Sequence, residues 1–267
     1  MIEIALLQTN IKYCEPEQNY KRVRELFAEA MMKEPRPDIV VLPEDWSTGF
    51  SVEMFHNIEQ YLEPPDGPSV TVLQELARRY DVWVCGGSVS TRFEDGRRST
   101  SFFINRKGEV VGDFSKMHLC SDGDEDLAFL HGEKTEVFDT ELGKLAFMIC
   151  YDIRFPELST LYALKGAELI IVMANFPNPR LDHWRTLLRA RAIENQMFVA
   201  ACNRVGESPM GTYCGHSMII NPWGEVIAEG GDMEEEIVSA SIDLSEEKAV
   251  REMIHKFRDR RPQNCYK

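Results

Sequence analysis

The chain has 267 residues, of which 43% are hydrophobic and 28% are charged, a composition typical of a globular protein that buries a large core. Its formal net charge of −14 would repel a polyanion at long range, which argues against nucleic acid as a partner. The N-terminus lacks the basic and apolar segments of a signal peptide, and no apolar run reaches the length of a membrane span. We therefore expect no membrane partner.

The cysteines indicate a reducing compartment. They are odd in number, scattered, and include no C-x-x-C pair: Cys14, Cys85, Cys120, Cys150, Cys202, Cys214 and Cys265. A disulfide framework or a structural zinc site needs paired spacings that this pattern lacks. We therefore expect a cytoplasmic protein without a structural metal.

Strands and helices alternate through the first half of the chain. The apolar patterns predict strands at residues 2–7, 38–42 and 82–89, with helices at 20–33 and 70–80. Residues 101–105 and 109–114 alternate around a turn of type Arg-Lys-Gly, which predicts a β-hairpin. The order of these elements is typical of an α/β protein.

The second half continues in the same way. We expect strands at 145–150, 168–173 and 197–203, and helices at 156–165 and 183–195. Three further strands are expected between 215 and 244, divided by turns at 221–224 and 230–231, before a short helix from Ser245. The strands are apolar on both faces, as in sheets covered on both sides. No repeat or linker divides the chain, so we expect one domain over residues 1–267.

Three predicted elements end in a reactive side chain. Glu44 follows an apolar strand and a proline, Lys116 follows the second hairpin strand, and Cys150 is the last residue of the strand at 145–150. Reactive groups in open α/β sheets lie at such strand ends, and the turn after Cys150 offers N–H donors for an oxyanion. Each residue also has an ordinary structural explanation: a turn cap, a surface lysine and a small core residue, respectively.

The three motifs together resemble those of the nitrilase superfamily, the carbon–nitrogen hydrolases with a glutamate–lysine–cysteine triad. The matching segments are Leu42-Pro43-Glu44, Lys116 within Ser-Lys-Met-His-Leu, and the eight residues from Cys150 to Glu157, Cys-Tyr-Asp-Ile-Arg-Phe-Pro-Glu. The likeness extends over essentially the whole chain. It implies a four-layer α-β-β-α sandwich that associates into a homodimer or a larger assembly.

The resemblance assigns catalytic roles that fit the chemistry of amide hydrolysis. A thiol with a pKa of about 8.5 needs a base to take its proton as it attacks. Glu44 is expected to be that base. Lys116 and the backbone N–H of Tyr151 are expected to bind the tetrahedral oxyanion. The expected course is attack by Cys150, release of ammonia and hydrolysis of the thioester, with no metal or organic cofactor.

A second glutamate completes the site in many family members, and Glu125 is the candidate here. It lies in the acidic run from Asp122 to Asp126, which as a solvated loop would need no catalytic explanation. The resemblance favours Glu125 as a residue that supports the lysine and orients the substrate. Whether its side chain reaches the pocket is left open by the sequence.

The flanking residues are most similar to the omega-amidase branch, whose substrates are terminal amides of short 2-oxo acids such as 2-oxoglutaramate. Such substrates carry a free carboxylate, which a guanidinium group binds with two hydrogen bonds. Arg154 is the candidate for this contact, although an ion pair with Glu157 one helical turn away is an equal alternative. Phe50 and Asn175 are expected to be pocket walls. Asp45 departs from the family pattern, because many relatives carry methionine or leucine there.

Other functions remain as alternatives. Within the superfamily these are an N-carbamoyl or aliphatic amidase, while a true nitrilase fits less well because the segment after Cys150 differs from that branch. From another class, a non-catalytic metabolite-binding member is possible, but it would not need all three triad residues. A zinc site at His118 and Cys120 lacks further ligands, and a papain-like histidine is superfluous beside Glu44 and Lys116.

Overall fold

The strands form two large sheets in the computed structural model, which describes residues 1–261; Cys265 lies outside this range. In one sheet the strands are ordered β15 (Glu236–Ile242), β1 (Ile2–Gln8), β2 (Ile39–Val41), β3 (Trp83–Cys85), β5 (Gly96–Ile104) and β4 (Val89–Phe93), with β6 (Val110–Ser115) also paired to β5. In the other they are ordered β14 (Val226–Glu229), β13 (Met218–Ile220), β10 (Phe198–Asn203), β9 (Leu169–Ala174), β8 (Gly143–Ile149) and β7 (Phe138–Thr140).

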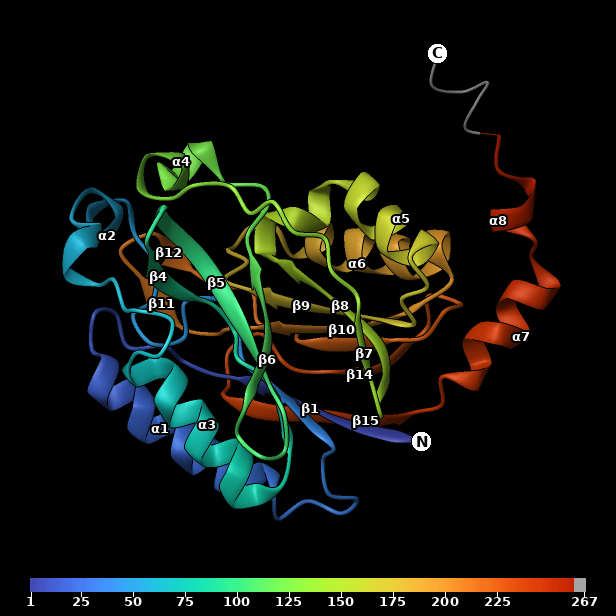
Figure 1. Cartoon of the computed structure of the whole chain (residues 1–267), viewed down its shortest axis with the longest axis horizontal. Coiled ribbons are helices and arrows are strands. Elements are labelled where there is room, and N and C mark those ends of the chain that lie inside the picture. Colours follow the sequence, from blue (N-terminus) through green and yellow to red (C-terminus); the bar gives the residue numbers. More distant parts are fainter. Residues whose placement is uncertain (262–267) are drawn as a thin grey trace.

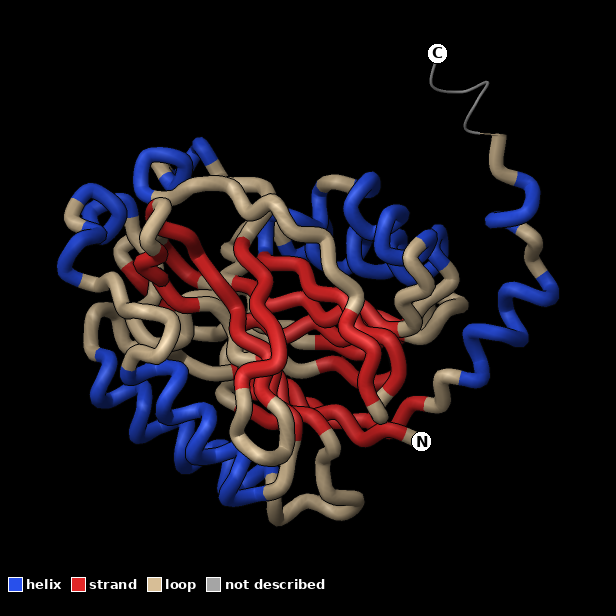
Figure 2. The backbone as a smooth tube through the Cα atoms, in the orientation of Figure 1, coloured by secondary structure: helices blue, strands red, loops and turns tan. Residues whose placement is uncertain are grey.

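Helices cover the outer face of each sheet. The first sheet carries α1 (Pro16–Ala30) and α3 (Pro68–Tyr80), whose apolar residues pack on its outer face, and the second carries α5 (Pro156–Leu164) and α6 (Leu181–Asn195). Figure 1 shows the two helix pairs on opposite sides of the strands, and Figure 2 shows the strands between them. The predicted α/β fold with a four-layer α-β-β-α sandwich is confirmed.

The core between the sheets is built around aromatic contacts. Phe103 of the first sheet meets Phe147 of the second edge to face, with ring centroids 5.1 Å apart. Trp83 stacks on Phe103 at 4.8 Å, and Phe138 stacks on Phe147 at 5.0 Å. Such pairs add to the stabilisation that burial of the rings itself provides. The inner faces of both sheets are therefore closed against water.

The first and last strands of the chain pair in the first sheet. Strand β15 pairs antiparallel with β1 along its whole length, from the partners Ile2 and Ile242 to Gln8 and Glu236. The preceding strand β14 instead pairs with β13 in the second sheet. Beyond β15, α7 (Ser245–Met253) and α8 (Lys256–Asp259) extend away from the four layers in Figure 1. No helix of residues 1–261 is long and apolar enough to span a bilayer.

Most predicted elements are confirmed with shifts of a few residues at their ends. The helix predicted at 20–33 begins at Pro16 and ends at Ala30. Its earlier start is explained by Pro16, because proline is favoured in the first helical turn. The strand predicted at 82–89 is wrong as a single element. The segment instead contains β3, a turn at Gly86 and Gly87, and the start of β4 at Val89.

Short elements were missed by the sequence patterns. They are α2 (Val52–His56), the 3₁₀ helices η1 (Ile58–Gln60) and η2 (Ser121–Gly123), α4 (Glu125–Ala128), α8, and the small hairpin of β11 (Glu207–Ser208) and β12 (Gly211–Thr212). The turn that was expected after Cys150 is the 3₁₀ helix η3 (Cys150–Arg154). Strand β7 was also missed. Segments of two to five residues give too few positions for a period to be recognised. Helices α2 and α4 pack together over one end of the sandwich through a small apolar cluster (Figure 1).

Candidate active site

Cys150 begins a tight turn at the end of strand β8. The sequence predicted Cys150 as the last residue of the strand. In the structure β8 ends one residue earlier, at Ile149, and Cys150 is the first residue of η3. Its φ of +45° lies in the left-handed region, which is strained for a residue other than glycine. This left-handed conformation bends the chain sharply. As a result, the Cys150 thiol lines a cavity while Ile149 stays in the core. Burial and the neighbouring Glu44 raise the pKa of the Cys150 thiol well above its usual range, against a lowering by Lys116.

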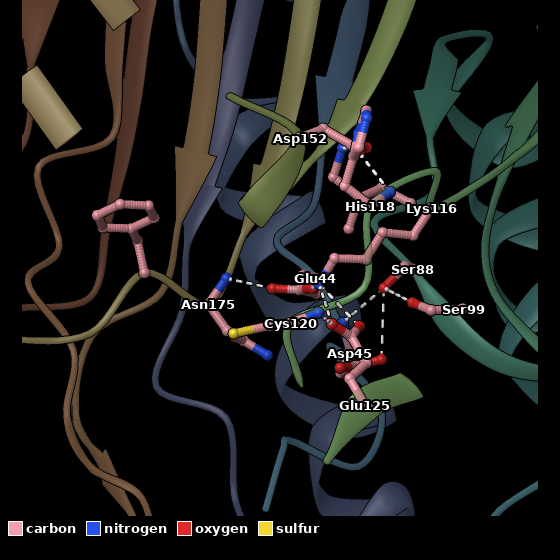
Figure 3. A network of polar contacts seen from close by, with 12 residues as sticks. Glu44, Asp45, Ser88, Ser99, Lys116, His118, Cys120, Glu125, Asp152 and Asn175 are labelled. Atoms are coloured by element: carbon pink, nitrogen blue, oxygen red, sulfur yellow. Dashed lines mark hydrogen bonds and ion pairs between the residues drawn. The ribbon is translucent and has the colours of Figure 1, made fainter. Parts of the chain in front are cut away.

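The carboxylate of Asp152 stabilises this turn. Its Oδ2 accepts a hydrogen bond from the backbone N–H of Ile149, and its Oδ1 accepts one from the backbone N–H of His118, each at 2.9 Å. The ring of His118 bonds the same carboxylate at 2.8 Å and stacks on Phe155 at 3.7 Å. The cysteine turn and the loop after Lys116 are therefore held together (Figure 3). No sequence motif marks this contact.

Glu44 lies directly across from the cysteine turn, at the end of the short strand β2. Its side chain is 1% exposed, and both carboxylate oxygens have partners. Oε1 accepts a hydrogen bond from Lys116 Nζ at 2.7 Å, and Oε2 accepts one from the backbone N–H of Asn175 at 2.8 Å. A turn cap, which was the ordinary explanation for Glu44, would not bring its carboxylate to two other strand ends.

Lys116 is buried between two carboxylates. It follows strand β6, its side chain is 2% exposed, and Nζ donates to Glu44 and to both oxygens of Glu125, at 2.7 and 2.9 Å. Burial alone would lower the pKa of Lys116, but Glu125 and Glu44 outweigh it and hold the pKa well above its usual range. The lysine is therefore an ammonium ion at neutral pH. A surface lysine that extends toward water is excluded.

Glu125 reaches the site through Lys116. It is the first residue of α4 and is fully buried, unlike its exposed neighbours Asp122 and Asp126. Its Oε2 also accepts the backbone N–H of Cys120 at 2.8 Å. Burial raises the pKa of Glu125, against a lowering by the lysine. A solvated acidic loop therefore does not describe this residue, and Figure 3 shows it close to Glu44 and Lys116.

The cavity beside Cys150 has a volume of about 180 Å³. Cavities that hold drug-sized ligands measure about 300–1,000 Å³, so this one suits a smaller molecule. All four residues that we expected at the substrate line it: Phe50, Tyr151, Arg154 and Asn175. Wall residues that the sequence did not reveal include Phe176, Arg180, Met210 and Tyr213. They lie in loops after β9 and between β11 and β13, where no periodic pattern or motif marks them.

Arg154 faces aromatic rings rather than a carboxylate. Its guanidinium lies over the rings of Phe176 at 5.4 Å and Tyr151 at 5.8 Å. Within residues 1–261 no ion pair joins it to Glu157, which was the alternative explanation. Asn175 also lines the cavity. Both polar atoms of its buried side chain lack a hydrogen-bond partner in the described structure, so they are available to a bound molecule.

The structure gives no support to a metal site or a catalytic histidine in the part of the chain that it describes. No group of three or more metal-ligating side chains is present there. The cavity is lined by no histidine of residues 1–261, and the ring of His118 is bonded to Asp152.

The comparisons with known proteins all identify the same family. Residues 3–252 match the family model described as carbon-nitrogen hydrolase. The chain is 41% identical over 256 residues to the 2-oxoglutaramate amidase of Bacillus subtilis (strain 168), covering 96% of each chain. It is 32% identical to an omega-amidase of Saccharomyces cerevisiae, covering 97% of this chain and 93% of that one. The crystal structure of S. cerevisiae Nit3, in branch 10 of the nitrilase superfamily, superposes with a TM-score of 0.86 at 31% identity, covering 95% and 94% of the two chains.

Proposed function

The chain belongs to the carbon–nitrogen hydrolase family, and we propose that it hydrolyses the terminal amide of a short carboxylic acid, such as 2-oxoglutaramate, with release of ammonia. The observation that carries the proposal is the buried ion cluster of Glu44, Lys116 and Glu125 beside a thiol that lines a small cavity. Burying three charges is unfavourable unless they have a function or excellent pairing. Here the cluster supplies a base and a cation next to Cys150.

In the first half of the proposed reaction, the Cys150 sulfur bonds to the amide carbon while its proton passes to Glu44. The high pKa of the thiol means that it attacks with the help of a base and is not a free thiolate at rest. Lys116 and the backbone N–H of Tyr151 bind the negative oxygen of the tetrahedral intermediate. Glu44 then gives the proton to the leaving nitrogen, the C–N bond breaks, and ammonia departs from a thioester.

The second half regenerates the enzyme. Glu44 takes a proton from a water molecule that attacks the thioester carbon, and Lys116 again binds the oxyanion. The C–S bond breaks, the carboxylic acid leaves, and Cys150 recovers its proton from Glu44. No metal or organic cofactor enters these steps. Glu125 contributes by keeping Lys116 charged and fixed in place.

Arg154 is proposed to bind the free carboxylate of the substrate. Its guanidinium lines the cavity and has no carboxylate partner among residues 1–261. An omega-amidase substrate would place its amide at Cys150 and its carboxylate at this arginine. Phe50 and Asn175 are proposed as further walls of the same pocket.

Replacing Arg154 with lysine is expected to raise KM for amides that carry a carboxylate, by roughly tenfold or more, because lysine cannot form the paired hydrogen bonds of a guanidinium. KM for a neutral amide of similar size should change by less than about twofold. Steady-state kinetics on the two substrates measures the difference. Equal effects on both would return Arg154 to a purely structural role.

The substrate class is tested by ammonia release from a panel of compounds. The panel contains 2-oxoglutaramate, 2-oxosuccinamate, a neutral aliphatic amide, an N-carbamoyl amino acid and a nitrile. We expect turnover of the 2-oxo acid amides, dependent on Cys150. Turnover confined to another compound would move the protein to the aliphatic or N-carbamoyl amidases, and the absence of any turnover would favour a metabolite-binding role.

We also propose that the chain acts as one domain, in the cytoplasm, as a homodimer or a larger assembly. Exposed apolar residues on the layer of α5 and α6, such as Leu164 and Ile193, support the association. Light scattering on the purified protein should give at least twice the mass of one chain. The mass of a single chain at micromolar concentration would contradict the assembly.

A further inference from the structure

Asp45, the residue after the proposed base, is a buried carboxyl group that the reaction steps above do not use. Its side chain is 1% exposed. Oδ1 accepts one hydrogen bond, from the hydroxyl of Ser88 at 3.3 Å, and Oδ2 has no partner among the described residues. Buried polar groups without partners are rare in native proteins and call for an explanation.

The backbone conformation at this position suits aspartate. Asp45 has a φ of +43°, in the left-handed region that aspartate tolerates better than leucine or methionine. Its carbonyl accepts the backbone N–H of Gly49 at 2.7 Å, which closes the turn. The loop after β3 packs directly on this turn, because a Cβ at Gly87 would lie 2.2 Å from the carbonyl oxygen of Pro43. Glycine at that place lets Ser88 approach Asp45.

A line of buried hydroxyl groups then joins Asp45 to the lysine. The Ser88 hydroxyl accepts hydrogen bonds from the backbone N–H of Asp45 at 3.1 Å and from the Ser99 hydroxyl at 3.0 Å. The carbonyl of Ser99 accepts the backbone N–H of Lys116 at 2.9 Å. Figure 3 shows Ser88 between Asp45 and Ser99. The backbone beside Glu44 is thus connected to the backbone of Lys116 independently of the ion cluster.

The charges around Asp45 disfavour its ionised form. The groups that act on it, from every element nearby, are Glu44 on its own turn, Lys116 after β6, Glu125 on α4, Arg204 after β10, and Tyr213 after β12. Lys116 is already shared by two carboxylates. Arg204 donates to the backbone carbonyls of Val205 and Ile11 through Nε and Nη2, and its Nη1 has no partner in the described structure. Burial, and after it the two glutamates, therefore raise the pKa of Asp45 well above its usual range.

We propose that Asp45 is a positioning residue for the reaction: as a neutral carboxylic acid bonded to Ser88, it holds Glu44 against Lys116 without adding a second uncompensated charge to the site. The proposal rests on the amidase function above, because it assigns Asp45 its role through the base.

Two substitutions at Asp45 separate the hydrogen bond from the charge. Asp45→Asn keeps the shape and neutrality, so kcat for 2-oxoglutaramate should stay within about threefold of wild type, with the same pH profile of kcat/KM. Asp45→Leu removes the side-chain bond to Ser88, although the backbone N–H bond to the Ser88 hydroxyl remains. It should lower kcat roughly 100-fold at nearly unchanged KM, as small displacements of a catalytic group do. Wild-type kcat in Asp45→Leu would overturn the proposal. A pH profile shifted in Asp45→Asn would show that the ionised form is the one used, and would overturn it too.

A second pair of variants keeps the test valid if Asp45→Leu fails to fold. Ser88→Ala removes the hydroxyl that bonds Asp45 and should lower kcat roughly tenfold. Ser90→Ala is the matched control. Ser90 is buried in β4, two residues after Ser88, but its hydroxyl has no partner in the described structure, so kcat should not change. Equal kcat values for the two variants would contradict the role of the hydroxyl line.

The neutrality of Asp45 is also tested without catalysis. A folded state that keeps a proton which the unfolded chain releases loses stability as the pH rises. The unfolding equilibrium constant of wild type should therefore increase relative to that of Asp45→Asn by about tenfold per pH unit, starting near pH 4 and ending at the pKa of folded Asp45. Parallel stability curves would contradict the neutral form. This outcome does not depend on the substrate, whereas an inactive wild type would count against the proposed function.

Discussion

Replacing Cys150 with alanine is expected to lower turnover of a 2-oxo acid amide by roughly 10⁴-fold or more, because the proposed reaction has no path without the thioester. The fold should remain intact. The side chain lines a cavity at the end of β8, so that shrinking it to a methyl group changes the free energy of unfolding by only about 1 kcal/mol. Ammonia release and thermal unfolding measure the two effects on the same sample.

Cys14→Ala provides the matched control. Cys14 is a free, half-buried cysteine that does not line the cavity in the described structure. Its variant should keep wild-type turnover and stability. Retained hydrolysis in Cys150→Ala would show that a different group attacks the amide, and the whole mechanism would then have to be abandoned.

Lys116→Met is expected to have two large effects. Turnover should fall by roughly 10³-fold, because the oxyanion loses a charged donor and Glu44 loses its partner. Stability should fall by about 3–5 kcal/mol, because Glu44 and Glu125 remain buried without a counter-charge. Protonation of these carboxylates would relieve the strain, so the loss of stability should shrink as the pH is lowered toward about 4.

The control for this prediction is a lysine outside the site. Lys134→Met removes an exposed lysine that lies 3.4 Å from Asp113, and such surface pairs contribute only about 0–1 kcal/mol. Kinetics and denaturant unfolding are compared for the two variants. A Lys116→Met protein as stable as Lys134→Met would mean that the buried carboxylates do not depend on the lysine.

The sequence was informative where long periodic elements or dense motifs occur. Strands β8 to β10 and helices α5 and α6 were predicted within two residues of their ends. The strands were recognisable because each is a long apolar run with clear boundaries. The motifs around Glu44, Lys116 and Cys150 predicted side chains that the structure brings to one cavity. These residues lie far apart in the chain, and only the order of the strands in the two sheets makes them neighbours.

Other parts of the site had no readable signal in one sequence. The burial of Glu125 depends on α4 packing against α2, a contact between two helices of four and five residues. Arg180 and Met210 line the cavity from irregular loops. The bond between His118 and Asp152 joins two motifs that were considered separately. The unusual residue at Asp45 was noticed, but its link to Ser88 depends on a close approach of two turns that no local pattern encodes.

The partition of turnover between water and hydroxylamine tests whether Cys150 carries the acyl group. Wild type would be given the amide and the methyl ester of the same acid, with hydroxylamine present, and the hydroxamate and free acid would be quantified. A common thioester predicts the same hydroxamate-to-acid ratio from both substrates, and loss of both products in Cys150→Ala. A ratio that depends on the leaving group, or products that persist without Cys150, would contradict the claim.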